Sequence, residues 1–443
     1  MKQKIRIKVR YLLLGLLSLS GECLCAEQTL SLNADKCGRM AVENSRTISN
    51  YQIAKRQAEL DVKVADISRL PNLQGMATGM CLLPDMEMMG MKVEMRGAYM
   101  AGLQITQPIY AGGKITAGRR LARIGRDVAE EQLRMERMDV MADALKSYWT
   151  YVAVLDKVKL TKSYTAMIDT ILGQTAVAVE VGMATENDLL RISAKRSEIA
   201  YQMKKAESGA ELCRLALCNA IGADLDTRIL LTDSMPEYRD NDQLTTDISA
   251  RPELALLRHK VEASRQQVKM TLGDFLPTVG LSLGYNWYGN IKMKGYADVG
   301  NGMMIPYTTK MQDNFGMAML AVQIPIFHWG EGAKKVRRAK LEVERSQLEL
   351  EENSELLELQ ARQAAMNLED GLTLIKTAET ALKQAVENLR VMQERYDTGM
   401  SNLTDLMDAQ NQWQQAHSDM IEASTQYQIY RIEWLRSIGK LGE

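Results

Sequence analysis

Two long stretches of the chain combine helical periodicity with a complete absence of proline, residues 114–181 and residues 331–398. Because proline breaks helix interiors, each stretch can form one continuous helix, which would reach roughly 100 Å at ~1.5 Å per residue. No single globular core covers a rod of that length. The second stretch has an apolar residue or a tyrosine at every seventh position, which is typical of a coiled-coil seam: Leu368, Ile375, Leu382, Leu389 and Tyr396.

Shorter stretches alternate between apolar and polar residues, which is the pattern of half-buried strands. Residues 98–105, 279–287 and 318–326 alternate in this way. Segments of about nine to eleven residues are long enough to cross a bilayer when they are tilted. Aromatic residues gather at or near their ends, as in outer-membrane barrels: Tyr99, Tyr110, Tyr285, Trp287, Tyr288, Phe327 and Trp329. A small soluble sheet is the alternative interpretation of the strands alone.

The pattern occurs twice, at a constant offset of 217 residues. Segment 107–113 matches segment 324–330, and Gly182 matches Gly399, so that 74 positions separate Pro108 from Gly182 and also Pro325 from Gly399. Two markers at one fixed separation in both halves indicate a duplicated structural unit.

A single copy of this chain cannot pair the backbone groups at the edges of its own strands. Four strands do not close a barrel, and an open edge in lipid leaves backbone groups unsatisfied at a cost of several kcal/mol each. The apolar stripes of the long helices also need partners beyond one chain. Several chains that share one barrel would meet both demands, whereas a soluble sheet would meet only the first.

We expect eight segments along the chain. They are a signal peptide (1–26), N-terminal helices (27–70), a first β-hairpin (71–112), a first long helical hairpin (113–222), a connector (223–251), a helix of the second repeat (252–275), a second β-hairpin (276–329) and a second long helical hairpin (330–443). Residues 81–94 and 289–314 are predicted to be loops within the two β-hairpins.

The N-terminus has a cationic region followed by an apolar run that is too short to span a bilayer, as in a secretory signal. Cys23 or Cys25 is a possible lipidation site, although Glu22 and Leu24 are not the small residues that lipidation favours. We expect the remaining cysteines to be buried small hydrophobic residues, because their spacing fits neither a metal site nor a disulfide framework: Cys37, Cys81, Cys213 and Cys218.

The composition excludes several classes of function. The formal net charge is −1, and no basic patch suggests nucleic acid as a partner. The three histidines are scattered, and no phosphate-binding or nucleophile motif occurs, so we expect no enzyme activity, no cofactor and no metal centre. Methionines crowd the first β-hairpin, where they are either adaptable hydrophobic residues or soft ligands for Cu(I) or Ag(I): Met76, Met80, Met86, Met88, Met89, Met91 and Met95.

These features together resemble the TolC-type outer membrane efflux proteins, also called outer membrane factors. The resemblance covers essentially the whole mature chain and rests on the duplicated plan, on Gln107–Gly113 and on Tyr396–Asp408. It implies a mostly helical α+β membrane protein in the outer membrane of a Gram-negative bacterium, with a large periplasmic portion. Each chain of a homotrimer would contribute four strands to a twelve-stranded β-barrel. Its long antiparallel coiled-coil helices would form a periplasmic α-barrel, and residues 223–251 would lie in an equatorial belt.

The resemblance also implies a function and its partners. The trimer would be the exit duct of a tripartite efflux or type I secretion system. A periplasmic adaptor and an inner-membrane pump of the RND or ABC type would be its partners, and the outer membrane lipid would surround its barrel. Two alternatives are a secreted coiled-coil scaffold without a pore and a periplasmic adaptor protein. A scaffold has no need for strands of bilayer length, and adaptors carry one helical hairpin rather than two.

The family closes its tunnel at the periplasmic helix tips, and the resemblance places a gate there. The family tyrosine and aspartate match Tyr396 and Asp188, but Ser401 stands where the family has an arginine. Acidic rings that favour cations match Asp405 and Asp408. Seam packing is the simpler role for Tyr396, and interaction with the helix dipole is the simpler role for Asp405.

Glycines and prolines mark the predicted turns. Gly182 and Gly399 are expected to form the helix-tip turns, which would set the surface for adaptor docking. Strand-to-helix turns are expected at the positions that repeat in the two halves: Pro108, Gly113, Pro325 and Gly330.

Overall fold

We describe a computed structural model of the chain over residues 29–88, 91–232, 244–298 and 303–442. The predicted signal peptide, Cys23, Cys25, Met89 and part of the predicted connector lie outside these residues. The chain divides into two compact units. One consists of residues 47–136 and 248–360, and the other consists of residues 1–46, 137–247 and 361–443.

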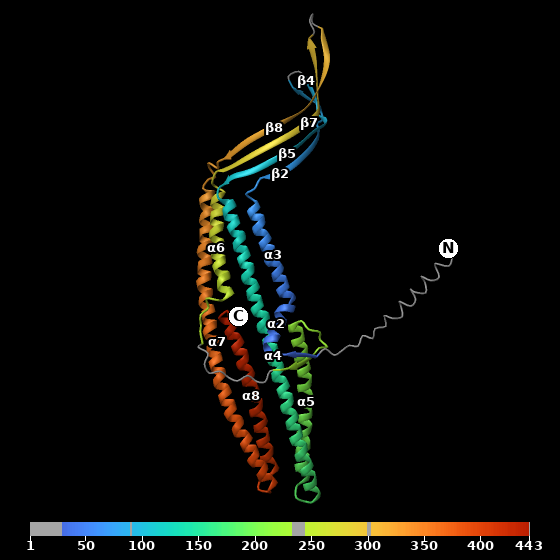
Figure 1. Ribbon diagram of the computed structural model, residues 1–443, viewed down its shortest axis with the longest axis vertical. Coiled ribbons are helices and arrows are strands. Elements are labelled where there is room, and N and C mark those ends of the chain that lie inside the picture. Colours follow the sequence, from blue (N-terminus) through green and yellow to red (C-terminus); the bar gives the residue numbers. More distant parts are fainter. Residues whose placement is uncertain (1–28, 89–90, 233–243, 299–302, 443) are drawn as a thin grey trace, which may run out of the picture. The chain divides into compact units, whose positions relative to one another are not determined.

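A sheet of four long antiparallel strands forms one end of the unit 47–136/248–360 (Figure 1). The strands are β2 (Asn72–Cys81), β5 (Arg96–Ala111), β7 (Thr278–Asp298) and β8 (Met304–Gln323), in the order β2-β5-β7-β8. Asn72 pairs with Thr106 in the first hairpin, and Thr278 pairs with Gln323 in the second. The two hairpins therefore share one register, which confirms the duplication in the sequence.

The strands β7 and β8 are longer than the sequence predicts. Residues 289–314 were expected to form a loop, but the ladder continues across a register shift after Tyr288 and ends with Asp298 opposite Met304. The predicted loop 81–94 also contains two short strands, β3 (Met86–Met88) and β4 (Met91–Glu94), and β4 pairs with β7. Both predictions were wrong because these ladders join residues whose alternation is masked by glycine, lysine and aspartate.

The helices of this unit follow the repeat. They are α3 (Arg46–Ile67), α6 (Pro252–Gly273) and the first parts of α4 (Lys114–Glu180) and α7 (Glu331–Asp397). The helix α3 contacts α4 through Lys55 and Glu130, whose charged atoms lie 2.8 Å apart. In the same way α6 contacts α7 through Lys260 and Glu349, at 2.6 Å.

The other unit is built from two helical hairpins. The rest of α4 precedes α5 (Glu186–Ile221), and the rest of α7 precedes α8 (Leu403–Ser437). A short helix, α2 (Ala34–Asn44), belongs to the same unit. Leu368 and Ile375 of the predicted heptad series are buried against Tyr427, Trp434 and Ile438 of the C-terminal part. Leu389 and Tyr396 pack against a second buried cluster near the helix tips.

A parallel pair of strands was not predicted. β1 (Thr29–Leu32) pairs with β6 (Arg228–Leu231), although residues 29–70 were expected to be helical and 223–251 to be an irregular connector. Each strand has only four residues, and its partner lies about 200 positions away, so the local pattern gives no signal. Cys37 and Cys218 are buried as expected, and Cys213 is partly buried. Cys81 is exposed, which corrects the prediction for that residue.

None of the helices in the described residues combines the length and the apolar character that a membrane span requires.

Candidate functional site at the helix tips

The turn between α4 and α5 depends on a glycine and on a capped helix. Gly182 has φ +78°, a left-handed conformation that side chains disfavour. The amide of Met183 donates to the carbonyl of Ala178 at 2.7 Å and so closes the end of α4. Thr185 then caps α5, since its hydroxyl accepts from the amide of Asp188 at 3.2 Å and the carboxylate of Asp188 accepts from the amide of Thr185.

The turn between α7 and α8 has the same construction. Gly399 has φ +74°, and the amide of Met400 donates to the carbonyl of Arg395 at 2.8 Å. The side chain of Asn402 accepts from the amide of Asp405 at 2.9 Å and caps α8. The two tips are thus matching turns at the repeat offset, and the predicted glycines form them.

The predicted acidic residues are bound to their own tips. The carboxylate of Asp188 lies 2.7 Å from the hydroxyl of Thr185, and this hydrogen bond lowers the pKa of Asp188. The carboxylate of Asp405 accepts from the hydroxyl of Ser401 at 3.2 Å. Asp405 and Asp408 are both exposed. Asp188 and Asp405 therefore both occupy the first turn of a helix, where the dipole favours a negative charge.

Tyr396 lies in an apolar cluster at the tips. It is half-buried and packs with residues from both helical hairpins, among them Ile168, Ile192 and Leu406. In the described part of the chain no hydrogen bond joins Tyr396 to Asp188. The structure thus brings Tyr396 to the seam but does not tie it to the aspartate.

One contact between the two tips was missed by the sequence analysis. The guanidinium of Arg191 on α5 donates to the hydroxyl of Thr404 on α8 at 3.0 Å, across 213 positions of sequence. Arg191 follows Asp188 by three residues, so the two side chains share a helix face, and Arg191 also helps to lower the pKa of Asp188. The position of Arg191 on that face was visible in the sequence, but its partner was not.

The tips also expose apolar side chains. Met183 is 85% exposed and Met400 is 80% exposed, and each directly follows a tip glycine. Val181 and Leu190 are exposed on the first tip as well. Isolated exposed apolar residues are ordinary, but several at one end of a hairpin are typical of a contact surface.

The strand-to-helix turns repeat a second local geometry. Gly112 and Gly113 have φ +61° and +79°, and the matching residues Trp329 and Gly330 have φ +49° and +76°. A side chain at position 112 would place its Cβ 2.4 Å from the carbonyl oxygen of Gly273, so glycine is required there. Trp329 carries a large side chain at the matching position, and that side chain is exposed.

The two predicted prolines differ in their surroundings. Pro108 lies within β5, at a register shift in the pairing with β7. Pro325 follows β8, which ends at Gln323 rather than continuing to Ile326 as predicted. The reason is that β5 has β7 beside it at this point, whereas β8 has no strand on that side among the described residues.

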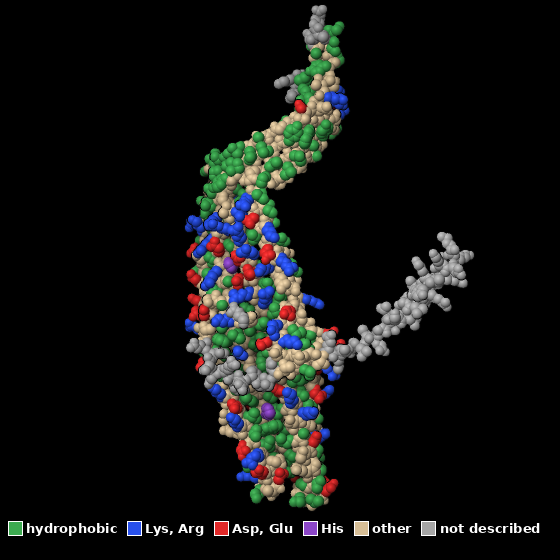
Figure 2. All heavy atoms as spheres, in the orientation of Figure 1, with side chains coloured by type: hydrophobic (Ala, Val, Ile, Leu, Met, Phe, Trp, Pro, Cys, Tyr) green, Lys and Arg blue, Asp and Glu red, His purple; other side chains and the backbone are tan. Residues whose placement is uncertain are grey.

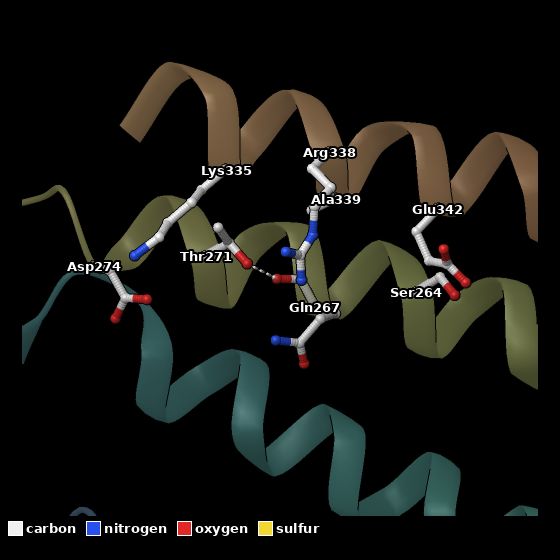
Figure 3. A pocket seen from close by; sticks show the side chains of 8 residues that line it. All are labelled: Ser264, Gln267, Thr271, Asp274, Lys335, Arg338, Ala339 and Glu342. Carbon is white, nitrogen blue, oxygen red and sulfur yellow. Dashed lines mark hydrogen bonds between the residues drawn. The ribbon is translucent and has the colours of Figure 1, made fainter. Parts of the chain in front are cut away.

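A polar cavity of about 380 Å³ lies between α6 and α7 (Figure 3). Arg338 extends from α7 toward Gln267 on α6, and Lys335 extends toward Asp274. Two basic and two acidic side chains line the cavity and offset one another, so it favours neither anions nor cations. Its lining residues are Ser264, Gln267, Thr271, Asp274, Lys335, Arg338, Ala339 and Glu342.

Charge is distributed unevenly over the molecule. In Figure 2 the four-stranded part of the sheet is covered with hydrophobic and uncharged side chains, while lysines, arginines and acids are spread over the helices. Within the described residues no three histidine, cysteine, aspartate or glutamate side chains are grouped so that they could hold a metal ion. The candidate site is therefore the pair of matched helix tips.

Comparison with known proteins agrees with this architecture. The sequence profile of the family described as "Outer membrane efflux protein" matches residues 38–212 and 247–440. The chain is 20% identical to the outer membrane efflux protein BepC of Brucella suis, over 92% of this chain and 86% of that protein. It is 22% identical to the alkaline protease secretion protein AprF of Pseudomonas aeruginosa, over 76% of this chain and 68% of that protein.

The fold is also that of a solved channel. The CmeC outer membrane channel of Campylobacter jejuni superposes with a TM-score of 0.74 at 19% sequence identity, and the match covers 92% of this chain and 85% of that one. Since the family profile accounts for most of the chain and the folds agree, the chain belongs to the outer membrane efflux protein family.

Proposed function

We propose that three copies of this chain form the exit duct of a tripartite efflux or type I secretion system. The duct conducts exported solutes passively, and the energy comes from an inner-membrane pump of the RND or ABC type, which a periplasmic adaptor connects to the duct. The names of AprF, a secretion protein, and BepC, an efflux protein, support both kinds of system.

The observation that carries this proposal is the duplicated sheet with two open edges. In the described residues, β2 and β8 each have a long neighbour on one side only. The contact between β5 and β7 shows how the end of one hairpin joins the start of the next. The same contact, repeated between β8 of one chain and β2 of the next, would close three sheets into one barrel without free edges.

The repeat also gives the register of that contact. Gln104 of β5 pairs with Gly284 of β7. Residues of β5 and β8 correspond at an offset of 217, and residues of β2 and β7 at 206, as the two hairpin registers show. Ala321 of one subunit should therefore lie opposite Thr78 of the next.

Cysteine cross-linking tests this assembly. In a background with Cys81→Ser, which removes the exposed thiol, oxidation of the pair Ala321→Cys and Thr78→Cys should give a covalent trimer on a denaturing gel. The pair Ala321→Cys and Ala77→Cys is the control, because a shift of one residue moves a side chain to the other face of the sheet. Equal cross-linking of both pairs would reject the register. A mature chain that is a water-soluble monomer and conducts no ions in planar bilayers would reject the duct.

We assign the closed state of the tips to contacts between the two helical hairpins of one chain. Ser401 cannot supply the charge of the family arginine, but Arg191 reaches Thr404 from the other hairpin. Arg191→Ala should increase the open probability of the channel in planar bilayers. Lys195→Ala is the matched control, since Lys195 pairs with Glu198 one turn away on the same helix and not with the other hairpin among the described residues. No difference between the two variants would exclude this role of Arg191.

Asp405 and Asp408 would form two acidic rings in the trimer. They lie three residues apart on α8 and are exposed, so threefold symmetry would bring like charges together around the axis. Multivalent cations added on the periplasmic side should block conductance, and Asp405→Ala should relieve the block. A block of equal strength in both proteins would leave Asp405 with only its interaction with the helix dipole.

The adaptor would dock on the exposed apolar residues that follow Gly182 and Gly399. Cells that depend on this duct should lose export when Met183→Asp and Met400→Asp are combined, because a charge on each tip opposes burial in a protein interface. The trimer and its conductance should be unchanged. Met366→Asp is the control, since Met366 is exposed on α7 and does not belong to a tip turn. Normal export by the double variant would remove these residues from the docking surface.

A further inference from the structure

The register of the sheet sorts its apolar residues by chemistry as well as by face. One face carries leucine, isoleucine and valine, including Leu73, Leu103 and Leu283 in adjacent strands, whereas aromatic residues occur on both faces. The other face is polar and includes Gln74, Gln104, Ser282 and Asn286. Side chains alternate between faces along a strand, so the pairings fix the side of every residue.

All methionines in the four-stranded part of the sheet lie on the polar face. They are Met76 and Met80 on β2, Met100 on β5, and Met317 and Met319 on β8. In the paired segments 72–80, 98–107, 278–288 and 313–323, leucine, isoleucine and valine occur on the opposite face only. If methionine served here as an ordinary hydrophobic residue, no such separation would be expected. The separation indicates that the thioether sulfur has a role of its own on this face.

These methionines do not fill a core. Each of the five is between 42% and 54% exposed. The polar face in the same segments carries one charged residue, Asp313, and no lysine or arginine, so nothing there repels a cation. The residues share their face with amides, hydroxyls and glycines, which are weak competitors for a soft ion, and with the aromatic pair Tyr288 and Phe315.

Three of the thioethers can converge. Met100 pairs directly with Thr78, so Met76 and Met80, two positions to either side, are its diagonal neighbours on the same face. Diagonal neighbours are about 7–8 Å apart at Cα, which long side chains can bridge. The residues opposite Met76 and Met80 are Gly102 and Ala98, which have no side chain or a small one, and the side-chain amide of Asn286 lies over Gly102. Methionine has three rotatable side-chain bonds, so each thioether can adjust its position to reach its neighbours.

The proposed trimer would extend this group, and to that extent the inference rests on the proposed function. In the register derived above, Met319 lies opposite the neighbouring subunit's Met80. The methionines of β8 would then join those of β2 across each subunit boundary, and they would form a continuous band on the face of the barrel that is turned away from lipid.

We propose that this methionine face binds soft monovalent cations, Cu(I) and Ag(I), on the inner surface of the channel. Thioether sulfur is a soft ligand that favours such ions over hard cations such as Mg²⁺ and Ca²⁺. The sites are exposed and built from neutral ligands, which suits an ion that must enter and also leave.

The test compares Ag(I) binding to the full-length trimer and to a variant with Met76→Leu, Met80→Leu and Met100→Leu. Leucine keeps the size and apolar character of methionine but removes the sulfur. The comparison protein, this variant and the control variant all carry Cys81→Ser, because an exposed thiol would bind the metal itself. The control variant carries Met183→Leu, Met366→Leu and Met400→Leu, three exposed methionines outside the sheet.

We expect the tightest Ag(I) site, measured by calorimetry in chloride-free buffer, to be lost in the sheet variant and retained in the control. X-ray absorption of the Cu(I)-loaded protein should show sulfur ligands that disappear with the same three substitutions. Equal Ag(I) binding by all three proteins would overturn the proposal and would leave the methionines as an adaptable lining for organic solutes. Trimer formation and conductance are measured without metal, so a conducting trimer that binds no Ag(I) refutes this inference and not the proposed duct.

Discussion

Gly182 and Gly399 hold positive φ angles at the two points where a helical hairpin reverses. A Cβ added at either position meets no other atom within 4 Å, so space does not dictate glycine there. The backbone conformation does, because a left-handed residue other than glycine costs roughly 1–2 kcal/mol. The capping residues Thr185 and Asn402 follow three positions later in each turn and begin the next helix.

Substitution of the tip glycines should therefore destabilise the turns through the backbone alone. We expect Gly182→Ala and Gly399→Ala each to cost about 1–2 kcal/mol of local stability, seen as faster amide hydrogen exchange in the last turn of α4 or α7. Gly173→Ala is the control, since Gly173 lies inside α4 with a negative φ and free space, and alanine there should stabilise the helix by about 0.5–1 kcal/mol. Slower exchange at the tip in both kinds of variant would contradict this account.

The sequence located these single-residue features because each has a local cause. A glycine that reverses the chain and an aspartate in the first turn of a helix are both recognisable from their neighbours, and Gly182, Gly399 and Asp188 lie where they were expected. The contact of Arg191 with Thr404 could not be found in this way, since it depends on how two distant helices pack. Whether Tyr396, Asp405 and Asp408 form a gate stays a prediction for the assembled trimer.

At the scale of elements, α8 shows a mixed seam. Gln410, His417 and Ser424 recur every seventh residue, among apolar neighbours such as Leu406 and Trp413. Gln410 is fully buried, and neither atom of its amide has a hydrogen-bond partner within the described residues. Burial lowers the pKa of His417, so its ring is neutral at physiological pH. Polar residues in a helical seam cost stability but can fix the register of the helices.

Replacement of Gln410 by leucine should stabilise the protein. An unsatisfied buried amide costs about 1–3 kcal/mol, and leucine fills a similar volume without polar atoms. We expect Gln410→Leu to raise the thermal unfolding temperature measured by circular dichroism. The exposed Gln415→Leu on the same helix should shift it little, since surface changes are usually within about 0.5 kcal/mol. A lower unfolding temperature for Gln410→Leu would show that its amide has a partner in the assembled protein.

The elements themselves differed in how far the sequence could define them. The long helices α4 and α7 agree with their predicted ranges to within a residue or so, because periodicity and the absence of proline act over dozens of positions. The pair β1 and β6 and the outer parts of β7 and β8 were missed. Short strands and polar ladders are stabilised by partners that are distant in the sequence, and the local pattern of apolar and polar residues does not reveal those partners.

At the scale of the whole molecule, the duplication shows which contacts one chain lacks. The helix α6 has two neighbours, because Asp274 at its end pairs with Lys114 of α4 at 3.1 Å and Lys260 pairs with Glu349 of α7. Its counterpart α3, at an offset of 206, contacts α4 through Lys55. By the repeat, the second neighbour of α3 should be α7 of another subunit.

The surface of α3 agrees with a missing neighbour. Apolar side chains form an exposed stripe along one side of the helix: Ile53, Leu60, Val64 and Ile67. Their spacing of three, four and seven residues puts them on one face. An amphipathic helix that already packs on α4 has no other use for a second apolar stripe in water, so this face should be buried in the trimer.

Charges placed in this stripe should prevent assembly. The combination Leu60→Asp and Val64→Asp would leave two carboxylates in an apolar interface, where each costs several kcal/mol unless it is paired. We expect the detergent-solubilised protein to lose the trimer in native mass spectrometry, while circular dichroism still shows its helices. Gln52→Asp, on a flank of the same helix, is the matched control and should remain trimeric. A stable trimer with both aspartates in place would mean that the α6 contact with α4 is not repeated between subunits, and the derived pairing of β8 with β2 would lose its support from the helices.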